Sequence, residues 1–439
     1  MTTFTNLQSE GVERAVLVHV IVDQSEREQV LEQQELISLT ETAGATVVAQ
    51  VRQVLSHEHA ATLIGSGKLE ELARSVQENE ATLVICSVDL SGSQTRNIEH
   101  ECQVRVIDRT QLILDIFASR AKTFEGKAQV KLAQLSYLLP RLIGARSELS
   151  RQGGGIGTRG PGETKLETDR RKIRKEITDL KRIVQAGGER RRELRRRRQR
   201  QGVFSVGIVG YTNAGKTTLL AELAKRYGEK VMNGGHNRLF DTLDLTTRRI
   251  EYSGSTFVFT DTVGFIRSLP HHLVDAFRAT LEEAVDADVI VHVVDANDPY
   301  FEEKSETVYR VLEKDLHVTT PVVTLFNDKG ALGTLASQLL SDPKSTGSLF
   351  GSVLEPQILD ALLQRIDQQV GHRVAMHLRI PHDRSDILAQ AYRAGRLGEI
   401  MEDEHGLEFD LEIDRRRSLA FVPFIDQGSQ VKESANEQP

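Results

Sequence analysis

A glycine-rich segment between an apolar run and a helical run constrains the fold of this chain more than any other feature. The run VFSVGIVG is followed by GYTNAGKT at residues 210–217 and then by TLLAELAKRYG. A strand, such a loop and a helix form a phosphate-binding loop (P-loop), because glycines let backbone N–H groups converge on a phosphate at a helix N-terminus. We therefore expect an α/β nucleotide-binding domain, with Lys216 on the β and γ oxygens and the Thr217 hydroxyl on Mg²⁺. The expected nucleotide contacts are Gly210, Tyr211, Thr212, Asn213, Ala214, Gly215, Lys216, Thr217 and Thr218.

A second phosphate motif, DTVG, ends the apolar run STFVFT. The carboxylate of Asp261 can hold Mg²⁺ through water, and the N–H of Gly264 can bond the γ-phosphate. We predict Asp261 as a metal ligand and Lys216 and Gly264 as catalytic residues. The nucleotide contacts expected in this motif are Asp261, Thr262, Val263 and Gly264.

The residue after this motif is Phe265. Several GTPases have a glutamine there, which orients the attacking water. Because an apolar side chain cannot polarise water, we expect slow intrinsic hydrolysis that a partner stimulates.

The segment LFDTLDLTTR, residues 239–248, lies between the two motifs in the position of a switch loop. Such a loop gives Mg²⁺ a hydroxyl ligand in the triphosphate state. Thr242 is the favoured ligand, and Thr246 and Thr247 are the alternatives. The expected nucleotide contacts of this loop are Phe240, Asp241, Thr242, Leu243 and Asp244.

The base half of the site departs from the usual pattern. Guanine specificity normally comes from Asn-Lys-x-Asp after a strand, whereas the run PVVTLF is followed by Asn327, Asp328, Lys329 and Gly330. The aspartate that would accept both guanine N–H groups is replaced by glycine, and the lysine position holds an acid. A second guanine loop, Ser-Ala-Lys, is best matched by Ser352, Val353 and Leu354. The sequence therefore leaves the preference for GTP over ATP open.

Positive charge is concentrated in one segment of an acidic chain. The net charge is −7, but Lys165–Arg200, here called the basic arm, carries 16 Lys or Arg and 6 Asp or Glu. Clustered cations neutralise RNA phosphates, whereas a solvated helix pair, the alternative, usually carries mixed signs. Seven of these 16 cations, the arginines at 190–192 and 195–198, lie at the base of the arm. The residues predicted to contact RNA are Arg151, Arg159, Lys165, Arg170, Arg171, Lys172, Arg174 and Lys175.

The fold class predicted from these patterns is multidomain α/β. β-branched runs that alternate with amphipathic stretches indicate parallel βαβ units at the N-terminus. A glycine-rich tip that cannot be helical separates two long helices, and we expect the second helix to break at Gly187-Gly188. The predicted parts are an N-terminal α/β domain (1–124), a basic helical hairpin (125–202), a doubly wound, mostly parallel G domain (203–370), a small α+β domain (371–426) and a disordered tail (427–439).

Several protein classes are excluded by composition. Two cysteines, Cys86 and Cys102, cannot form a disulfide framework in 439 residues. No run approaches the roughly 20 apolar residues of a membrane span, and the N-terminus lacks the pattern of a signal peptide. We expect a cytoplasmic monomer without a transmembrane segment, and peripheral contact with a membrane is left open.

The motifs together resemble the HflX family of ribosome-associated GTPases. The resemblance is carried by GGGIGTRGPGETKLETDRRKIRKEI, GYTNAGKTTL, LFDTLDLTTR, DTVGFIRSLP and ADVIVHVVDANDP, and it covers about residues 14 to 300. It implies GTP/GDP and Mg²⁺ as cofactors, binding to the large ribosomal subunit and its rRNA, and splitting of stalled or idle ribosomes. It also implies that Thr217 and Thr242 are the Mg²⁺ ligands.

Two functional hypotheses follow. The first is a Mg²⁺-dependent GTPase, activated by the ribosome, that uses its nucleotide state to control subunit dissociation. The second is an RNA- or ribosome-binding factor whose nucleotide site has lost base specificity and acts as a weak ATPase or GTPase, or not at all.

Overall fold

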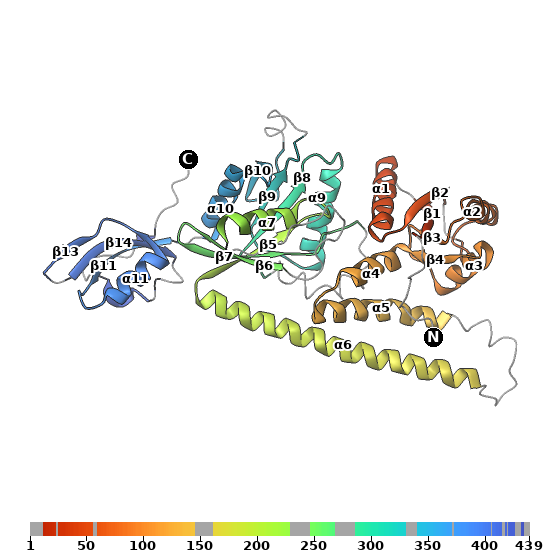
Figure 1. The fold of residues 1–439 in the computed structure, drawn as a ribbon, viewed down its shortest axis with the longest axis horizontal. Helices are drawn as coiled ribbons and strands as arrows, with labels where there is room; N and C mark the ends of the chain where they lie inside the picture. The colour runs from red at the N-terminus through yellow and green to blue at the C-terminus, as the bar shows by residue number, and fades with distance from the viewer. Residues whose placement is uncertain are drawn as a thin grey trace. The chain divides into compact units, whose positions relative to one another are not determined.

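The computed structural model describes most of the 439 residues (Figure 1). It falls into two compact units, one that runs to Ala186 and one that holds most of the chain from Gly187 onward. None of the helices in the described part is long and apolar enough to cross a membrane. The described ranges are 12–22, 25–55, 59–144, 161–228, 246–267, 286–330, 340–370, 373–404, 406–414, 418, 420–425 and 432–433.

The first unit contains a four-stranded parallel sheet in the order β2-β1-β3-β4. Its core includes the two free thiols, since Cys86 and Cys102 are both buried. Ser25 and Ser91 begin two of its helices with capping boxes, in which Glu28 and Gln94 bond back to the cap. The strands are β1 (Arg14–Ile21), β2 (Thr46–Val54), β3 (Leu83–Cys86) and β4 (Arg105–Asp108), and the helices are α1 (Glu26–Thr42), α2 (Ser66–Glu78), α3 (Gly92–Cys102) and α4 (Arg109–Arg120).

Asp108 ties the long helix α5 (Phe124–Gly144) to this domain. Its fully buried carboxylate accepts hydrogen bonds from Tyr137 Oη at 2.7 Å and Arg141 Nη2 at 2.7 Å, both on α5. It also accepts from the backbone N–H groups of Leu90 and Gln111, and it caps α4. Four donors therefore converge on one buried carboxylate.

Helix α6 (Pro161–Arg200) corrects two expectations. It begins at Pro161, inside the stretch predicted to be non-helical, because a proline at the first helical position loses no intrahelical hydrogen bond. It also continues through Gly187 and Gly188, where a break was expected. Glycine in a helix costs only about 1 kcal/mol relative to alanine, and strong helix formers flank the pair. The boundary between the two compact units nevertheless falls at this pair.

The nucleotide-binding domain of the second unit is a six-stranded sheet in the order β10-β9-β8-β5-β7-β6, and it confirms the doubly wound fold class. Only β6 runs antiparallel to its neighbour. The strands are β5 (Val203–Val209), β6 (Thr246–Tyr252), β7 (Ser255–Asp261), β8 (Val289–Asp295), β9 (Val322–Asn327) and β10 (Gly347–Gly351), and the helices are α7 (Lys216–Tyr227), α9 (Phe301–Arg310), the π-helical turn η1 (Val311–Asp315) and α10 (Pro356–Val370).

The C-terminal part is a small antiparallel sheet with one α-helix among its described residues (Figure 1). Its strand order is β12-β14-β11-β15, and β13 also pairs with β14. Strand β15 lies in the tail predicted to be disordered; it pairs with the edge of β11, whose unpaired backbone groups offer a template for a further strand. The elements are β11 (Arg373–Ile380), α11 (Ser385–Ala394), β12 (Gly395–Leu397), β13 (Met401–Asp403), β14 (Gly406–Asp414), the 3₁₀ turn η3 (Val422–Phe424) and β15 (Lys432–Glu433).

Candidate nucleotide site

The P-loop joins β5 to α7, and two of its glycines cannot be replaced without a clash. Gly210 has φ +151° and Gly215 has φ +106°, values that L side chains rarely adopt. A Cβ on Gly210 would lie 2.3 Å from the carbonyl oxygen of Val293, and one on Gly215 would lie 2.5 Å from Asn327 Nδ2. The loop therefore packs directly against the ends of β8 and β9, as a phosphate-binding turn requires.

Lys216 is a buried cation at the N-terminus of α7. Its ammonium donates to the carbonyl oxygens of Gly210 at 3.0 Å and Tyr211 at 2.7 Å, so it lies folded over the loop. Burial lowers its pKa to about 8, against the opposing effect of the Asp261 carboxylate. A phosphate anion at the helix N-terminus would supply the negative charge that favours the protonated form.

The two predicted metal ligands on described residues lie together. Thr217 Oγ1 donates to Asp261 Oδ2 at 2.8 Å, and Asp261 is fully buried at the end of β7. Thr246, one of the alternative switch threonines, is half-buried and stands opposite Asp261 in the β6–β7 register. Hydroxyl and carboxylate oxygens are ligands that Mg²⁺ accepts, so these residues fit the ion. When bound, Mg²⁺ would neutralise charge on the phosphates.

The DTVG backbone lies against the P-loop. Thr212 N–H donates to the Phe265 carbonyl at 2.9 Å, and Phe265 N–H donates to the Gly210 carbonyl at 3.1 Å. Only glycine fits at 264, where a Cβ would lie 2.7 Å from Thr212 Cγ2 and 3.0 Å from Lys216 Nζ. The Thr262 hydroxyl bonds the Ile208 carbonyl inside the domain, and Val263 is buried.

Phe265 is a core residue. It is 3% exposed and packs in a cluster with Val209, Tyr211 and Ile290. Its ring therefore contributes to the stability of the domain, and it presents no polar group to a water molecule. This agrees with the sequence argument that the position cannot orient an attacking water.

In the base loop, residues 327–330, the asparagine is at its usual place, and the lysine lies one position later than in Asn-Lys-x-Asp. Asn327 is buried, donates through Nδ2 to the Ala214 carbonyl at 3.0 Å, and accepts from Val353 N–H at 3.1 Å. Lys329 donates through Nζ to the Asn213 carbonyl of the P-loop at 2.9 Å and to Asp295 Oδ2 at 2.7 Å. The lysine thus reaches the P-loop from the third position of Asn-Asp-Lys-Gly.

Sequence reasoning missed Asp295 and Asn297. Asn297 Nδ2 donates to Asp328 Oδ1 at 3.1 Å, and its own side-chain oxygen accepts from Lys329 N–H at 2.6 Å. Both residues lie in the DAND segment at the carboxyl end of the buried strand β8, at the same sheet edge as the P-loop. Polar residues at the carboxyl end of a parallel strand beside a P-loop were the signal that could have identified them.

Several predicted residues lie outside the described part of the structure. They include the favoured metal ligand and the rest of its loop, as well as the glycine-rich tip; for Lys165 the backbone is described and the side chain is not. These predictions remain untested for Phe240, Asp241, Thr242, Leu243, Asp244, Arg151, Arg159 and Lys165.

The described basic side chains of α6 are mostly exposed, and some pair locally. Arg170 lies 3.6 Å from Glu167 and Lys172 lies 4.0 Å from Asp169, long pairs of the kind that contribute little in water. Arg195 departs from expectation, because it is buried and forms an ion pair with Asp286. It holds the base of the helix in place and presents no guanidinium to a ligand there.

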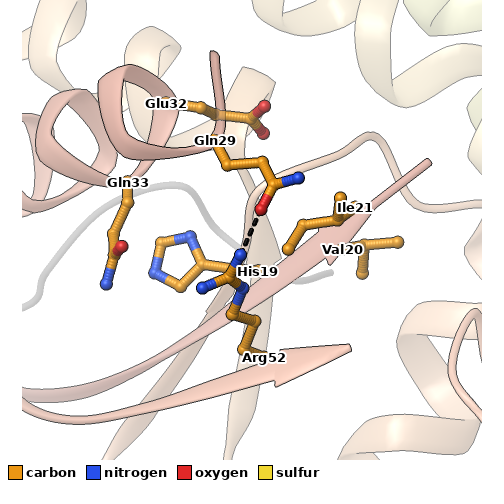
Figure 2. Close-up of a pocket in the computed structure, with 7 residues that line it drawn as sticks. All are labelled: His19, Val20, Ile21, Gln29, Glu32, Gln33 and Arg52. Atoms are coloured by element: carbon orange, nitrogen blue, oxygen red, sulfur yellow. Dashed lines mark hydrogen bonds between the residues drawn. The ribbon is translucent and has the colours of Figure 1, made fainter. Parts of the chain in front are cut away.

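A small cavity lies beside β1 in the first unit (Figure 2). Its volume is about 10 Å³, room for one water molecule at most. The Arg52 guanidinium donates to Gln29 across it, and burial lowers the pKa of His19. The cavity is too small for an organic ligand. It is lined by His19, Val20, Ile21, Gln29, Glu32, Gln33 and Arg52.

Three family descriptions match consecutive parts of the chain. Residues 31–118 match "GTP-binding GTPase N-terminal", residues 120–198 match "GTP-binding GTPase Middle Region", and residues 205–328 match "50S ribosome-binding GTPase". Together they cover more than half of the sequence.

Curated relatives match over most of their length. GTPase HflX of Alkalihalophilus pseudofirmus is 42% identical over 388 residues, which cover 88% of this chain and 90% of the relative. GTPase HflX of Escherichia coli is 39% identical over 404 residues, covering 90% and 92%. Among solved structures, a GTP-binding protein from Sulfolobus solfataricus in complex with GDP is 24% identical, with a TM-score of 0.42, over 82% of this chain and 99% of that one.

Proposed function

Since the chain belongs to the HflX family of GTPases, we propose that it binds the large ribosomal subunit and couples GTP hydrolysis to dissociation of subunits or rescue of stalled ribosomes. The observation that carries this proposal is the combination, in one chain, of the P-loop and DTVG residues of a phosphate site with a basic arm. Thr217 donates a hydrogen bond to Asp261, and the Asp261 carboxylate acts on the charge of Lys216. Exposed Lys and Arg side chains lie along α6.

In this proposal Thr217 and Asp261 hold Mg²⁺, and Thr242 joins them in the triphosphate state. Lys216 stabilises the charge that develops on the transferred phosphoryl group, an interaction that strengthens in the transition state. Gly264 N–H bonds the γ-phosphate, and its movement reports the nucleotide state to the rest of the protein.

The proposed RNA contacts are Arg170, Arg171, Lys172, Arg174 and Lys175, together with Arg151, Arg159 and Lys165. The protein acts as a monomer in the cytoplasm. Slow intrinsic turnover follows from Phe265, whose ring is buried in the core, so the ribosomal subunit supplies the missing activation.

The test compares GTP turnover with and without large ribosomal subunits, for the parent chain and for Lys216→Ala. We expect subunits to raise parent turnover at least tenfold, and the variant to remain inactive in both conditions. The variant loses the charge that faces the phosphates, a contribution worth several kcal/mol in such sites. Equal parent rates in both conditions would remove the activation proposal.

One observation favours the second hypothesis, an RNA-binding factor that ignores its nucleotide. Gly330 places no carboxylate where guanine is read. Subunit binding that is the same with GTP, with GDP and with neither nucleotide would support that hypothesis against the first.

A further inference from the structure

The loops that follow β8, β9 and β10 form the frame of a base pocket at one edge of the nucleotide-binding sheet. The strand register aligns Asp295 with Asn327, and Asn327 with Gly351. The Asn327 carboxamide joins the P-loop carbonyl of Ala214 to the N–H of Val353. The frame is therefore tied together by a residue that makes no distinction between bases.

Lys329 adds a second contact that is independent of the base. Its ammonium bridges the Asn213 carbonyl of the P-loop and the Asp295 carboxylate, at 2.9 and 2.7 Å. Its aliphatic stem therefore spans from the base loop to the P-loop. An apolar stem in this position can cover the flat face of any purine.

The carboxylates of the base loop are directed away from a reading role. Asp328 Oδ1 accepts from Asn297 Nδ2 at 3.1 Å and from Gly330 N–H at 2.9 Å, so its carboxylate closes the turn of its own loop. Asp295 accepts from Asn297 N–H and from Lys329. In the sequence, the next acid after Asp328 is Asp342, because residues 331–339 contain neither Asp nor Glu.

Asp342 is committed elsewhere in the domain. Its carboxylate accepts from Tyr309 Oη at 2.5 Å and Thr324 Oγ1 at 2.6 Å, and it lies 3.8 Å from buried His292. Burial raises the pKa of Asp342, but hydrogen bonds from His292, Thr324 and Tyr309 outweigh burial and lower it overall. A carboxylate stabilised in that cluster is not available to a base.

Three backbone donors of the two loops have partners within the protein. Val353 N–H bonds Asn327, Asp328 N–H bonds the Gly351 carbonyl at 3.1 Å, and Leu354 N–H bonds Ser352 Oγ at 3.3 Å. These three N–H groups are therefore engaged within the protein, and none of them is directed to a guanine O6.

We propose that this site selects its ligand by phosphate and purine shape, and that it accepts inosine and adenine nucleotides alongside guanine nucleotides. This inference rests on the proposed function, because it assumes that the nucleotide phosphates bind to the same P-loop. Inosine is the sharpest probe, because it lacks the 2-amino group that a carboxylate at position 330 would bind. Where that carboxylate is missing, GDP and IDP should bind alike.

The experiment measures dissociation constants of GDP, IDP and ADP with Mg²⁺ for the intact chain, in the absence of ribosomes. We expect GDP and IDP to agree within about threefold and GDP and ADP within about tenfold, a difference of about 1.4 kcal/mol. A GDP preference over IDP above tenfold would overturn the inference, and would point to exposed Glu355 as the reader.

Position 330 offers a matched pair of variants. A Cβ there meets nothing within 4 Å, and φ is +98°, so Gly330→Asp and Gly330→Asn carry the same backbone strain and differ only in carboxylate against amide. We expect Gly330→Asp to gain at least tenfold for GDP with no gain for IDP or ADP relative to Gly330→Asn. Equal GDP affinities of the two variants would contradict the inference that position 330 is where a carboxylate reads guanine.

A third variant keeps the test decisive if both position-330 variants fail to fold. Lys329→Ala should weaken GDP, IDP and ADP by the same factor, because the described partners of its ammonium are the P-loop and Asp295, and its stem would cover any purine alike. A loss confined to GDP would overturn the inference. Absence of binding for all three nucleotides to the parent would sink the proposed function itself, whereas tight binding of GDP alone would sink only the base inference.

Discussion

The side chain of Lys216 makes nucleotide binding depend on pH. Burial lowers its pKa to about 8, so the free protein loses this proton above that pH. A bound phosphate favours the ammonium and raises the pKa again. Affinity for GDP should therefore fall as pH rises above about 8, by at most tenfold per unit.

Calorimetry checks this at pH 8.5 in two buffers of different ionisation enthalpy. Proton uptake makes the observed enthalpy of GDP binding depend on the buffer. Lys216→Arg, which stays charged at this pH, should show no uptake. Identical parent enthalpies in both buffers would mean that Lys216 keeps its proton in the free protein.

Asp108 should contribute strongly to the stability of the first unit, because four donors converge on its buried carboxylate. Asp108→Ala should lower the free energy of unfolding by about 3–5 kcal/mol, since the Arg141 guanidinium and three other donors lose their acceptor. Ser91→Ala removes only a helix cap in the same domain and should cost about 1 kcal/mol. Urea unfolding measures the free energy of unfolding of both variants. Equal decreases would show that Asp108 contributes no more than a helix cap does.

Part of the nucleotide site could be predicted from the sequence. Lys216, Thr217 and Asp261 follow from local spacing, because a P-loop and a strand end fix their places whatever the rest of the chain does. Asn297 could not be predicted in the same way. Its partner Asp328 is distant in sequence, and only the pairing of β8 with β9 brings the two together.

Helix α6 shows that local helix propensity alone does not decide where a helix ends. A Gly-Gly pair predicts a break, yet the helix runs from Pro161 to Arg200. The two glycines weaken the helix by about 2 kcal/mol, but they do not prevent the helical conformation. In contrast, the buried parallel strands β5, β7, β8 and β9 were identifiable, because continuous apolar runs are typical of such strands. The short edge strand β10 has no such run and was not predicted.

Gly188→Ala should stabilise α6 by about 1 kcal/mol. Gly188 lies inside the helix, and an added Cβ meets only the Arg191 guanidinium at 3.8 Å, an ordinary contact. Hydrogen exchange of the amides near residue 188 should slow about fivefold. Gly188→Pro, which breaks a helix interior, is the opposing control. Faster exchange in the alanine variant would show that this glycine needs a conformation that alanine cannot adopt.

The net charge of the chain is divided between the basic arm and an acidic remainder. Reversing Arg170, Arg171 and Arg174 to Glu should weaken binding to large subunits and flatten its salt dependence, by roughly one unit of slope per lost phosphate contact. A control with the same change in net charge reverses exposed Lys225, Arg226 and Lys314, which lie outside the arm. Equal salt slopes for parent, arm variant and control would make the arm a solvated spacer.

The strand order of the nucleotide-binding sheet has a consequence for how the chain folds as it is made. β5 is synthesised first but lies in the interior of the sheet, between β8 and β7. Its neighbours begin only at Ser255 and Val289, so this first strand of the sheet is made several seconds before either partner at ordinary rates of synthesis. During that interval the apolar run of β5 is exposed, and the P-loop has no sheet to hold it. With this strand order, we expect the growing chain to bind nucleotide only after β7, which ends at Asp261, has emerged. The DTVG motif that contacts the γ-phosphate is then already synthesised when binding begins.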